Sequence, residues 1–113
     1  MTSECIFCKI LKKQIPSKIE FEDKDFAAFY DINPQAPVHL LIIPKKHIEK
    51  ISDLKDSDSN LVGELILCAK KIAAAKGWEN YRLLFNNGEE AGQSVFHIHL
   101  HLMSGRRFAW PPG

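Results

Sequence analysis

The stretch that decides the fold is His97-Ile98-His99-Leu100-His101-Leu102-Met103, in which three histidines alternate with three large apolar residues. A period of two is typical of a β-strand, because successive side chains of a strand point to opposite faces. We therefore predict a strand over residues 95–103, with the three imidazoles on one face and Ile98, Leu100 and Leu102 buried on the other. Neighbouring imidazoles would then lie about 6.5 Å apart. Three histidines spread over about 13 Å cannot all bind one metal ion through bonds of about 2 Å, so we expect them to have different roles.

The rest of the chain predicts four more strands and two helices. Strand-like runs cover residues 18–22, 26–30, 39–43 and 82–85, and the nearly all-apolar third run favours a central position. A short helix is predicted over residues 5–13, ending before Pro16. A long helix is predicted from about residue 58 to residue 76, with Gly77 just past its end. Its apolar stripe consists of Leu61, Leu65, Cys68, Ala69 and Ile72. This content indicates an α+β domain with a largely antiparallel, five-stranded sheet.

Length and composition indicate one globular domain over residues 1–113, with 45% hydrophobic and 26% charged residues. The formal net charge of +1 and the lack of a bilayer-spanning apolar run predict that neither nucleic acid nor a membrane is a partner. Met1-Thr2-Ser3-Glu4 is too short and polar to begin a signal peptide. We therefore expect a cytoplasmic protein whose cysteines, Cys5, Cys8 and Cys68, are reduced.

Two further groups of residues carry candidate chemistry. The loop over residues 86–94 contains two glycines and leads into the histidine run, so its backbone N–H groups and the Ser94 hydroxyl can face a phosphate. An imidazole can attack phosphorus while such donors stabilise the charge on the phosphoryl oxygens. Cys5 and Cys8 form a C-x-x-C pair, which is typical of either a redox dithiol or half of a zinc site. His47 and His97 can complete a Cys₂His₂ set.

Four segments together resemble the histidine triad (HIT) family, and in particular its branch of histidine triad nucleotide-binding (Hint) proteins. They are H-I-H-L-H-L-M (97–103), N-N-G-E-E-A-G-Q-S-V-F (86–96), D-I-N-P-Q-A-P-V-H-L-L-I-I-P-K-K-H-I (31–48) and the ending W-P-P-G. The resemblance covers essentially the whole chain. It implies a HIT-like fold whose sheet continues across a homodimer, with residues 104–113 as a C-terminal tail near the dimer interface and the active site.

The resemblance also implies an activity. It points to a purine nucleoside phosphoramidate hydrolase of the adenosine 5′-monophosphoramidase type, which cleaves a P–N bond and releases a nucleoside 5′-monophosphate. His101 stands where the nucleotidylyl-transferase branch of the family carries Gln, which favours hydrolysis over transfer. Two other functions stay open: a dinucleoside polyphosphate hydrolase, and a nucleotide-binding scaffold whose catalysis is incidental.

Residue by residue, the resemblance assigns His99 as the nucleophile that forms a nucleotidyl-imidazole intermediate. His101, His39 and Ser94 complete the catalytic set, the two histidines as contacts of the phosphate. The Asp31 carboxylate would accept the ribose hydroxyls, and a carboxylate suits a diol because it is an acceptor pair. The residues that would contact the phosphate or the leaving group are Asn86, Gly92, Ser94 and Val95. The apolar walls of the purine slot are Ile6, Phe7, Ile10, Phe29, Ile32 and Leu41, all of which also suit a plain core.

Two expectations concern metal and assembly. Some members of the family bind zinc with the set Cys5, Cys8, His47 and His97, and others lack the cysteines. We expect no cofactor in the reaction and a structural zinc at this set, with two reduced, idle cysteines as the alternative. For assembly, an exposed strand edge at residues 39–43 or 82–85 invites pairing with a second copy.

Overall fold

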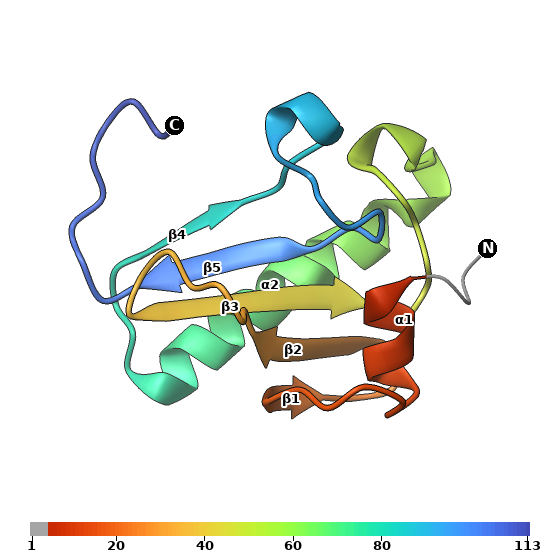
Figure 1. Ribbon diagram of the computed structural model, residues 1–113, viewed down its shortest axis with the longest axis horizontal. Helices are drawn as coiled ribbons and strands as arrows, with labels where there is room; N and C mark the ends of the chain where they lie inside the picture. The colour runs from red at the N-terminus through yellow and green to blue at the C-terminus, as the bar shows by residue number, and fades with distance from the viewer. Residues whose placement is uncertain (1–4) are drawn as a thin grey trace.

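One antiparallel sheet of five strands organises the computed structural model, which describes residues 5–113 (Figure 1). The strands are β1 (Ile19–Glu22), β2 (Phe26–Tyr30), β3 (Val38–Pro44), β4 (Tyr81–Leu84) and β5 (Leu100–Ser104). Their spatial order is β1-β2-β3-β5-β4, which confirms the predicted fold class and the central place of the third strand. Because β3 pairs with both β2 and β5, the expectation of an exposed edge at residues 39–43 was wrong. The edges are β1 and β4.

Two helices lie on opposite faces of this sheet, with α1 in front of it and α2 behind it in Figure 1. Helix α1 (Ile6–Leu11) is shorter than predicted, and Lys13 just beyond it has a positive φ of 62°. Helix α2 (Ser59–Lys76) follows Asp58 and ends, as expected, at Gly77. The amide of Trp78 donates to the Ala73 carbonyl at 2.9 Å, so the positive φ of 76° at Gly77 closes the helix end. None of the helices within residues 5–113 is long and apolar enough to cross a membrane.

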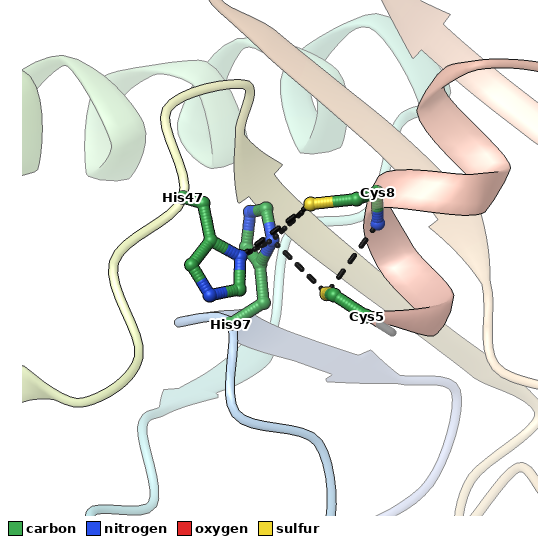
Figure 2. Close-up of side chains that lie close together, drawn as sticks. All are labelled: Cys5, Cys8, His47 and His97. Atoms are coloured by element: carbon green, nitrogen blue, oxygen red, sulfur yellow. Dashed lines mark hydrogen bonds between the residues drawn. The ribbon is translucent and has the colours of Figure 1, made fainter. Parts of the chain in front are cut away.

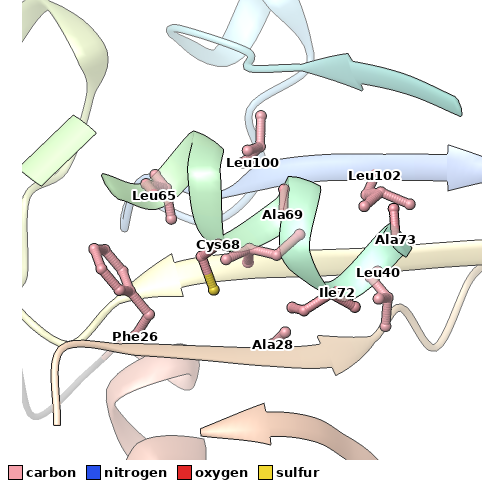
Figure 3. Close-up of a cluster of buried hydrophobic side chains, with 11 residues drawn as sticks. Phe26, Ala28, Leu40, Leu65, Cys68, Ala69, Ile72, Ala73, Leu100 and Leu102 are labelled. Carbon is pink, nitrogen blue, oxygen red and sulfur yellow. The ribbon is translucent and has the colours of Figure 1, made fainter. Parts of the chain in front are cut away.

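The strands divide their side chains between two cores, one on each face of the sheet. The larger core packs α2 onto β2, β3 and β5 (Figure 3), and it includes Cys68 as a small core residue, as expected. The smaller core packs Phe7 and Ile10 of α1 onto Ala27, Phe29, Leu41 and Ile43. Leu41 lies directly opposite His101 in the sheet, so this smaller core adjoins the histidines.

The histidine strand is shorter than the predicted residues 95–103, because β5 begins only at Leu100. The register places Ile42 opposite Leu100, so Pro44 would come opposite Ile98. Pro44 has no N–H to offer a neighbouring strand, and the Ile98 amide instead donates to the Ile48 carbonyl at 2.7 Å. The predicted tail also begins one residue later, since Ser104 ends β5 and its hydroxyl donates to the Asn80 carbonyl. The polar start at residues 1–4 lies outside the described residues.

Candidate catalytic site and thiol–imidazole cluster

The three histidines of the run have different surroundings, as their spacing predicts. His97 joins Cys5, Cys8 and His47, and we call these four residues the Cys–His cluster. His101 hydrogen-bonds to His39, and the ring centroids of His99 and His101 lie 4.9 Å apart. The site therefore consists of three neighbouring imidazoles, those of His39, His99 and His101, and the adjacent Cys–His cluster.

His99 is held in one tautomer by the backbone. Its Nδ1 lies 2.8 Å from the carbonyl oxygen of His97, and since a carbonyl only accepts, Nδ1 carries the proton. Nε2 therefore keeps its lone pair. Burial lowers the pKa of His99, and the Phe7 ring packs edge-on against the imidazole with centroids 5.1 Å apart. At neutral pH the result is an uncharged imidazole with a basic Nε2, which is the form that can attack an electrophile.

A chain of hydrogen bonds also determines the tautomers of His39 and His101. The Gln35 amide donates to His39 Nδ1 at 3.0 Å, so the proton of His39 lies on Nε2 and is donated to His101 Nδ1 at 2.9 Å. His101 must then carry its own proton on Nε2. This N–H is buried and has no partner within residues 5–113. Burial lowers the pKa of His101 to about 4, and it also lowers the pKa of His39. The pair of His39 and His101 is thus neutral, and the Nε2–H of His101 is free to donate to a ligand.

Asp31 follows β2 directly and places its carboxylate beside this pair. Oδ2 lies 3.5 Å from His39 Nε2, while Oδ1 accepts the Asn33 amide at 2.9 Å. Since Asp31 is only partly buried, its carboxylate also faces solvent, where a polar ligand can reach it.

The loop before β5 depends on a residue that the sequence analysis missed. Gln93 is only 2% exposed, and its Oε1 accepts the Gly88 amide at 2.8 Å. Its Nε2 donates to the carbonyls of Glu49 at 2.6 Å and Val95 at 3.1 Å. These three bonds shape the segment that presents Ser94, whose own side chain is exposed. A single glutamine in a polar loop has no periodicity, so the sequence contained no signal for its burial.

Other residues predicted for ligand contact lie around this loop and under α1. Asn86 Nδ2 reaches the Gly92 carbonyl at 3.5 Å, and Val95 packs against the smaller core. Four of the six predicted slot residues are buried together in that core, namely Phe7, Ile10, Phe29 and Leu41. Ile6 is 42% exposed and Ile32 is 96% exposed, so Ile32 projects into solvent and forms no wall in this structure.

The Cys–His cluster brings its four side chains to one point (Figure 2). His97 Nδ1 lies 3.2 Å from His47 Nδ1, 3.5 Å from Cys5 Sγ and 3.6 Å from Cys8 Sγ, and Cys8 Sγ lies 3.4 Å from His47 Nδ1. The proton of His97 is on the other nitrogen, because Nε2 donates to the Pro44 carbonyl at 2.7 Å. A tetrahedral zinc ion would separate its two nitrogens by about 3.3 Å and a nitrogen from a sulfur by about 3.5 Å. The residues therefore fit a closed four-ligand zinc site.

The tail is partly docked on the chain. The Arg82 guanidinium donates to the Ala109 carbonyl at 3.0 Å, and Arg106 donates to the Gln35 carbonyl at 3.2 Å. The centroid of the Phe108 ring lies 5.1 Å from the guanidinium carbon of Arg82 and 4.2 Å from that of Arg106. Trp110, by contrast, is 83% exposed.

The described residues line two cavities, and one of them adjoins these sites. One of about 480 Å³ lies between α2 and β1, and none of the predicted site residues lines it. The other, of about 390 Å³, is lined by Cys5, Ile6, His47, Glu49, Ser94, Val95 and Phe96. It therefore connects the Cys–His cluster with the loop that carries Ser94.

Comparisons with known proteins find relatives that match nearly the whole chain. Residues 4–108 match a family model described as scavenger mRNA decapping enzyme C-term binding. An uncharacterised HIT-like protein of Synechocystis is 50% identical over 114 residues, which is 100% of both chains. A HIT family hydrolase from Legionella pneumophila is 54% identical, with a TM-score of 0.94 over 97% of this chain and 100% of that one. A histidine triad protein from Clostridium difficile is 39% identical, with a TM-score of 0.90 over 94% of each chain.

Proposed function

The chain belongs to the histidine triad family, and from this premise we propose that it hydrolyses the P–N bond of purine nucleoside phosphoramidates, as an adenosine 5′-monophosphoramidase does. One observation carries the proposal. The neutral His99 offers a free Nε2 lone pair, and beside it the buried His101 N–H has no acceptor among residues 5–113. A phosphoryl group bound here would receive a nucleophile at phosphorus and a hydrogen bond at oxygen.

The reaction would proceed in two displacements on phosphorus. His99 Nε2 attacks the α-phosphorus, the Nε2–P bond forms, and the P–N bond breaks as the amine leaves with a proton from solvent. Water then attacks the nucleotidyl-imidazole, breaks the Nε2–P bond and releases the nucleoside 5′-monophosphate and a proton. The His101 N–H stabilises the charge on the phosphoryl oxygens in both steps. His39 keeps that N–H in place by donating to the other ring nitrogen of His101.

The rest of the substrate would lie along the elements around His99. The segment with Asn86, Gly92, Ser94 and Val95 would hold the phosphate and the leaving group. The Asp31 carboxylate would accept the ribose hydroxyls, and the apolar residues of α1, β2 and β3 would enclose the purine.

A substrate comparison tests this function. We expect purified protein to hydrolyse an adenosine 5′-phosphoramidate of a primary amine. We expect a mass spectrum of protein quenched in alkali, where a P–N bond to histidine survives, to show one nucleotidyl group on His99. Hydrolysis of a dinucleoside polyphosphate alone would assign the alternative reaction. If neither substrate reacts while AMP still binds in calorimetry, the protein is a nucleotide-binding scaffold and the proposed hydrolysis is wrong.

We also propose that the Cys–His cluster holds a structural zinc ion. The four separations in the cluster support this proposal, because each lies close to the edge of a zinc tetrahedron. Four protein ligands leave no open position, so the ion would stabilise the fold by tying α1 to the segments of His47 and His97. Elemental analysis should find about one zinc per chain. The double variant Cys5→Ser, Cys8→Ser should lose the metal and part of its thermal stability but keep its activity, and unchanged melting would favour idle cysteines.

A further inference from the structure

One cysteine of the Cys–His cluster is reachable from solvent and the other is not. Cys5 is partly exposed and lines the cavity of about 390 Å³, whereas Cys8 is buried behind it. A small neutral molecule in this cavity can therefore reach the sulfur of Cys5 first.

The two cysteines are also placed to form a bond with each other. The Cys8 amide donates to Cys5 Sγ at 3.4 Å, which holds that sulfur over the first turn of α1. Residues three apart in a helical turn have Cα atoms about 5 Å apart, within the range of roughly 4.4–6.8 Å that disulfides span. Rotation of the two side chains is then enough to join the sulfurs, which already lie within 4.8 Å of each other.

We propose that Cys5 is an oxidation site, at which hydrogen peroxide converts Cys5 and Cys8 into a disulfide and so releases the metal of the Cys–His cluster. The Cys5 thiolate attacks one peroxide oxygen and the O–O bond breaks. Hydroxide is the leaving group, and Cys5 becomes a sulfenic acid. The Cys8 sulfur attacks that sulfenic sulfur, the S–S bond forms and the S–O bond breaks. Two electrons from the two sulfurs thus reduce one peroxide, with two protons, to two waters.

Loss of the metal follows from the ligand chemistry, because the thiolate is the metal ligand and a disulfide is not. Only His47 and His97 would remain, and two imidazoles do not make a closed site. The tie between α1 and these two distant segments is then lost. A disulfide that closes a loop of four residues constrains the unfolded chain less than longer loops do. We therefore expect the oxidised protein to melt at a lower temperature than the zinc-loaded protein.

The third cysteine is a matched internal control. Cys68 lies in the larger core, on the opposite face of the sheet from Cys5 and Cys8, although it also lines a cavity. Burial raises the pKa of its thiol to about 11, so little of it is the nucleophilic thiolate at neutral pH. If access to a cavity were enough for oxidation, Cys68 would be oxidised as well, whereas the proposed route leaves Cys68 as a thiol.

The test treats zinc-loaded protein with a small molar excess of hydrogen peroxide. Released zinc is followed with a chromogenic chelator, and the thiols are mapped by alkylation and peptide mass spectrometry. We expect one Cys5–Cys8 disulfide and one released zinc per chain, formed at the same rate, with Cys68 still free to alkylate. Dithiothreitol and added zinc should restore the starting protein. Cys5→Ser should form no disulfide, and Cys68→Ala should respond as the unmodified chain does.

Three results would overturn the proposal: retained metal and thiols, equal oxidation of Cys68, or a stable sulfinic acid on Cys5 without a bond to Cys8. The peptide map of the unmodified chain gives this answer even where a serine variant does not fold. No substrate enters the experiment, so its outcome is independent of whether the chain hydrolyses phosphoramidates.

Discussion

The carbonyl of His97 links the two candidate sites at the level of single residues. It accepts the Nδ1 proton of His99, while the ring of the same residue belongs to the Cys–His cluster. A histidine two positions before the proposed nucleophile thus contributes its side chain to one site and its backbone to the other. The alternation of histidines and apolar residues predicts this separation of roles, but it does not predict which ring nitrogen stays free.

Replacement of His99 tests the covalent route directly. We expect His99→Ala to lower kcat on an adenosine phosphoramidate by at least about 10³-fold, because the nucleophile and its intermediate are both lost. The affinity for AMP should stay within a few-fold in calorimetry, since the other contacts remain. His99→Gln controls for the lost volume beside Phe7. Turnover by either variant near that of the unmodified protein would contradict the mechanism.

Protonation of His101 should make the fold weaker in mild acid. The pKa of His101 is about 4 in the folded chain, against about 6.5 when it is unperturbed. Between these two pH values His101 is protonated in the unfolded chain and neutral in the folded chain. The free energy of unfolding therefore has its full value above about pH 6.5 and falls as the pH drops towards 4. At about 1.4 kcal/mol per pKa unit, the free energy of unfolding falls by about 3 kcal/mol over this range.

Urea unfolding between pH 4 and pH 7 measures this loss. The variant His101→Gln cannot take up the proton and should show a shallower decline over the same range. Identical pH dependence in the two proteins would show that His101 does not titrate in this window. Agreement of their stabilities near pH 7 would confirm that the substitution itself leaves the fold intact.

At the scale of elements, the loop before β5 is organised from within by Gln93. This side chain holds two backbone groups of the loop, at Gly88 and Val95, and the carbonyl of Glu49 in a distant segment, so the loop that presents Ser94 should depend on its amide. In Gln93→Glu a carboxylate would face the carbonyls of Glu49 and Val95 without a proton to donate. Buried polar groups that lose their partners cost about 1–3 kcal/mol each, so we expect a loss of about 3 kcal/mol in unfolding free energy. Gln14→Glu, on an exposed residue, is the matched control and should change stability little.

Hydrogen exchange adds a local readout to this comparison. The Gly88 amide, which donates to Gln93, should exchange faster in Gln93→Glu than in Gln14→Glu. Equal protection of that amide in the two variants would mean that the loop keeps its shape without the amide of Gln93.

The sequence predicted regular elements better than the connections that build the site. Helix α2 and the central strand β3 carry long apolar patterns, and both were predicted within one residue of their bounds. The start of β5 was not predicted, because it depends on Pro44 coming opposite Ile98 through long-range register. The convergence of Cys5, Cys8, His47 and His97 was expected from the C-x-x-C pair together with the family resemblance, because the C-x-x-C spacing alone also suits a redox dithiol. The tautomers of His39 and His101 depend on the Gln35 backbone, which no side-chain pattern reveals.

For the whole molecule, the two sheet edges differ in ways that bear on assembly. The register of β1 shifts between Ile19 and Phe21, and its edge carries Glu20 and Glu22, features that protect an edge against pairing. Strand β4 pairs with β5 in unbroken register, and no further strand within residues 5–113 pairs with its outer edge. We therefore propose that a homodimer forms through β4, at the edge predicted at residues 82–85. Each Trp110 would then lie near the partner's catalytic face.

Removal of residues 107–113 tests this arrangement. The truncation deletes the Phe108 ring and the Ala109 carbonyl that Arg82 contacts, all outside both cores. We expect the melting temperature to change little and the relative kcat/KM for different amine leaving groups to change several-fold. Trp110 fluorescence should respond to AMP in a Trp78→Phe background. A monomer by light scattering, or unchanged selectivity among amines after truncation, would contradict the dimer-linked role of the tail.

The hydrogen-bond chain from Gln35 to His101 has a spectroscopic consequence. Because each ring has one protonated and one bare nitrogen, the neutral protein should give a distinct pattern in long-range ¹⁵N–¹H correlation spectra. His99 should show the Nδ1–H form, whereas His39 and His101 should both show the Nε2–H form. Binding of AMP should shift the Nε2 resonance of His101 most, since that nitrogen has no acceptor in the described part of the chain and would gain one from the phosphate. Magnetic resonance can thus report ligand engagement atom by atom, without any turnover.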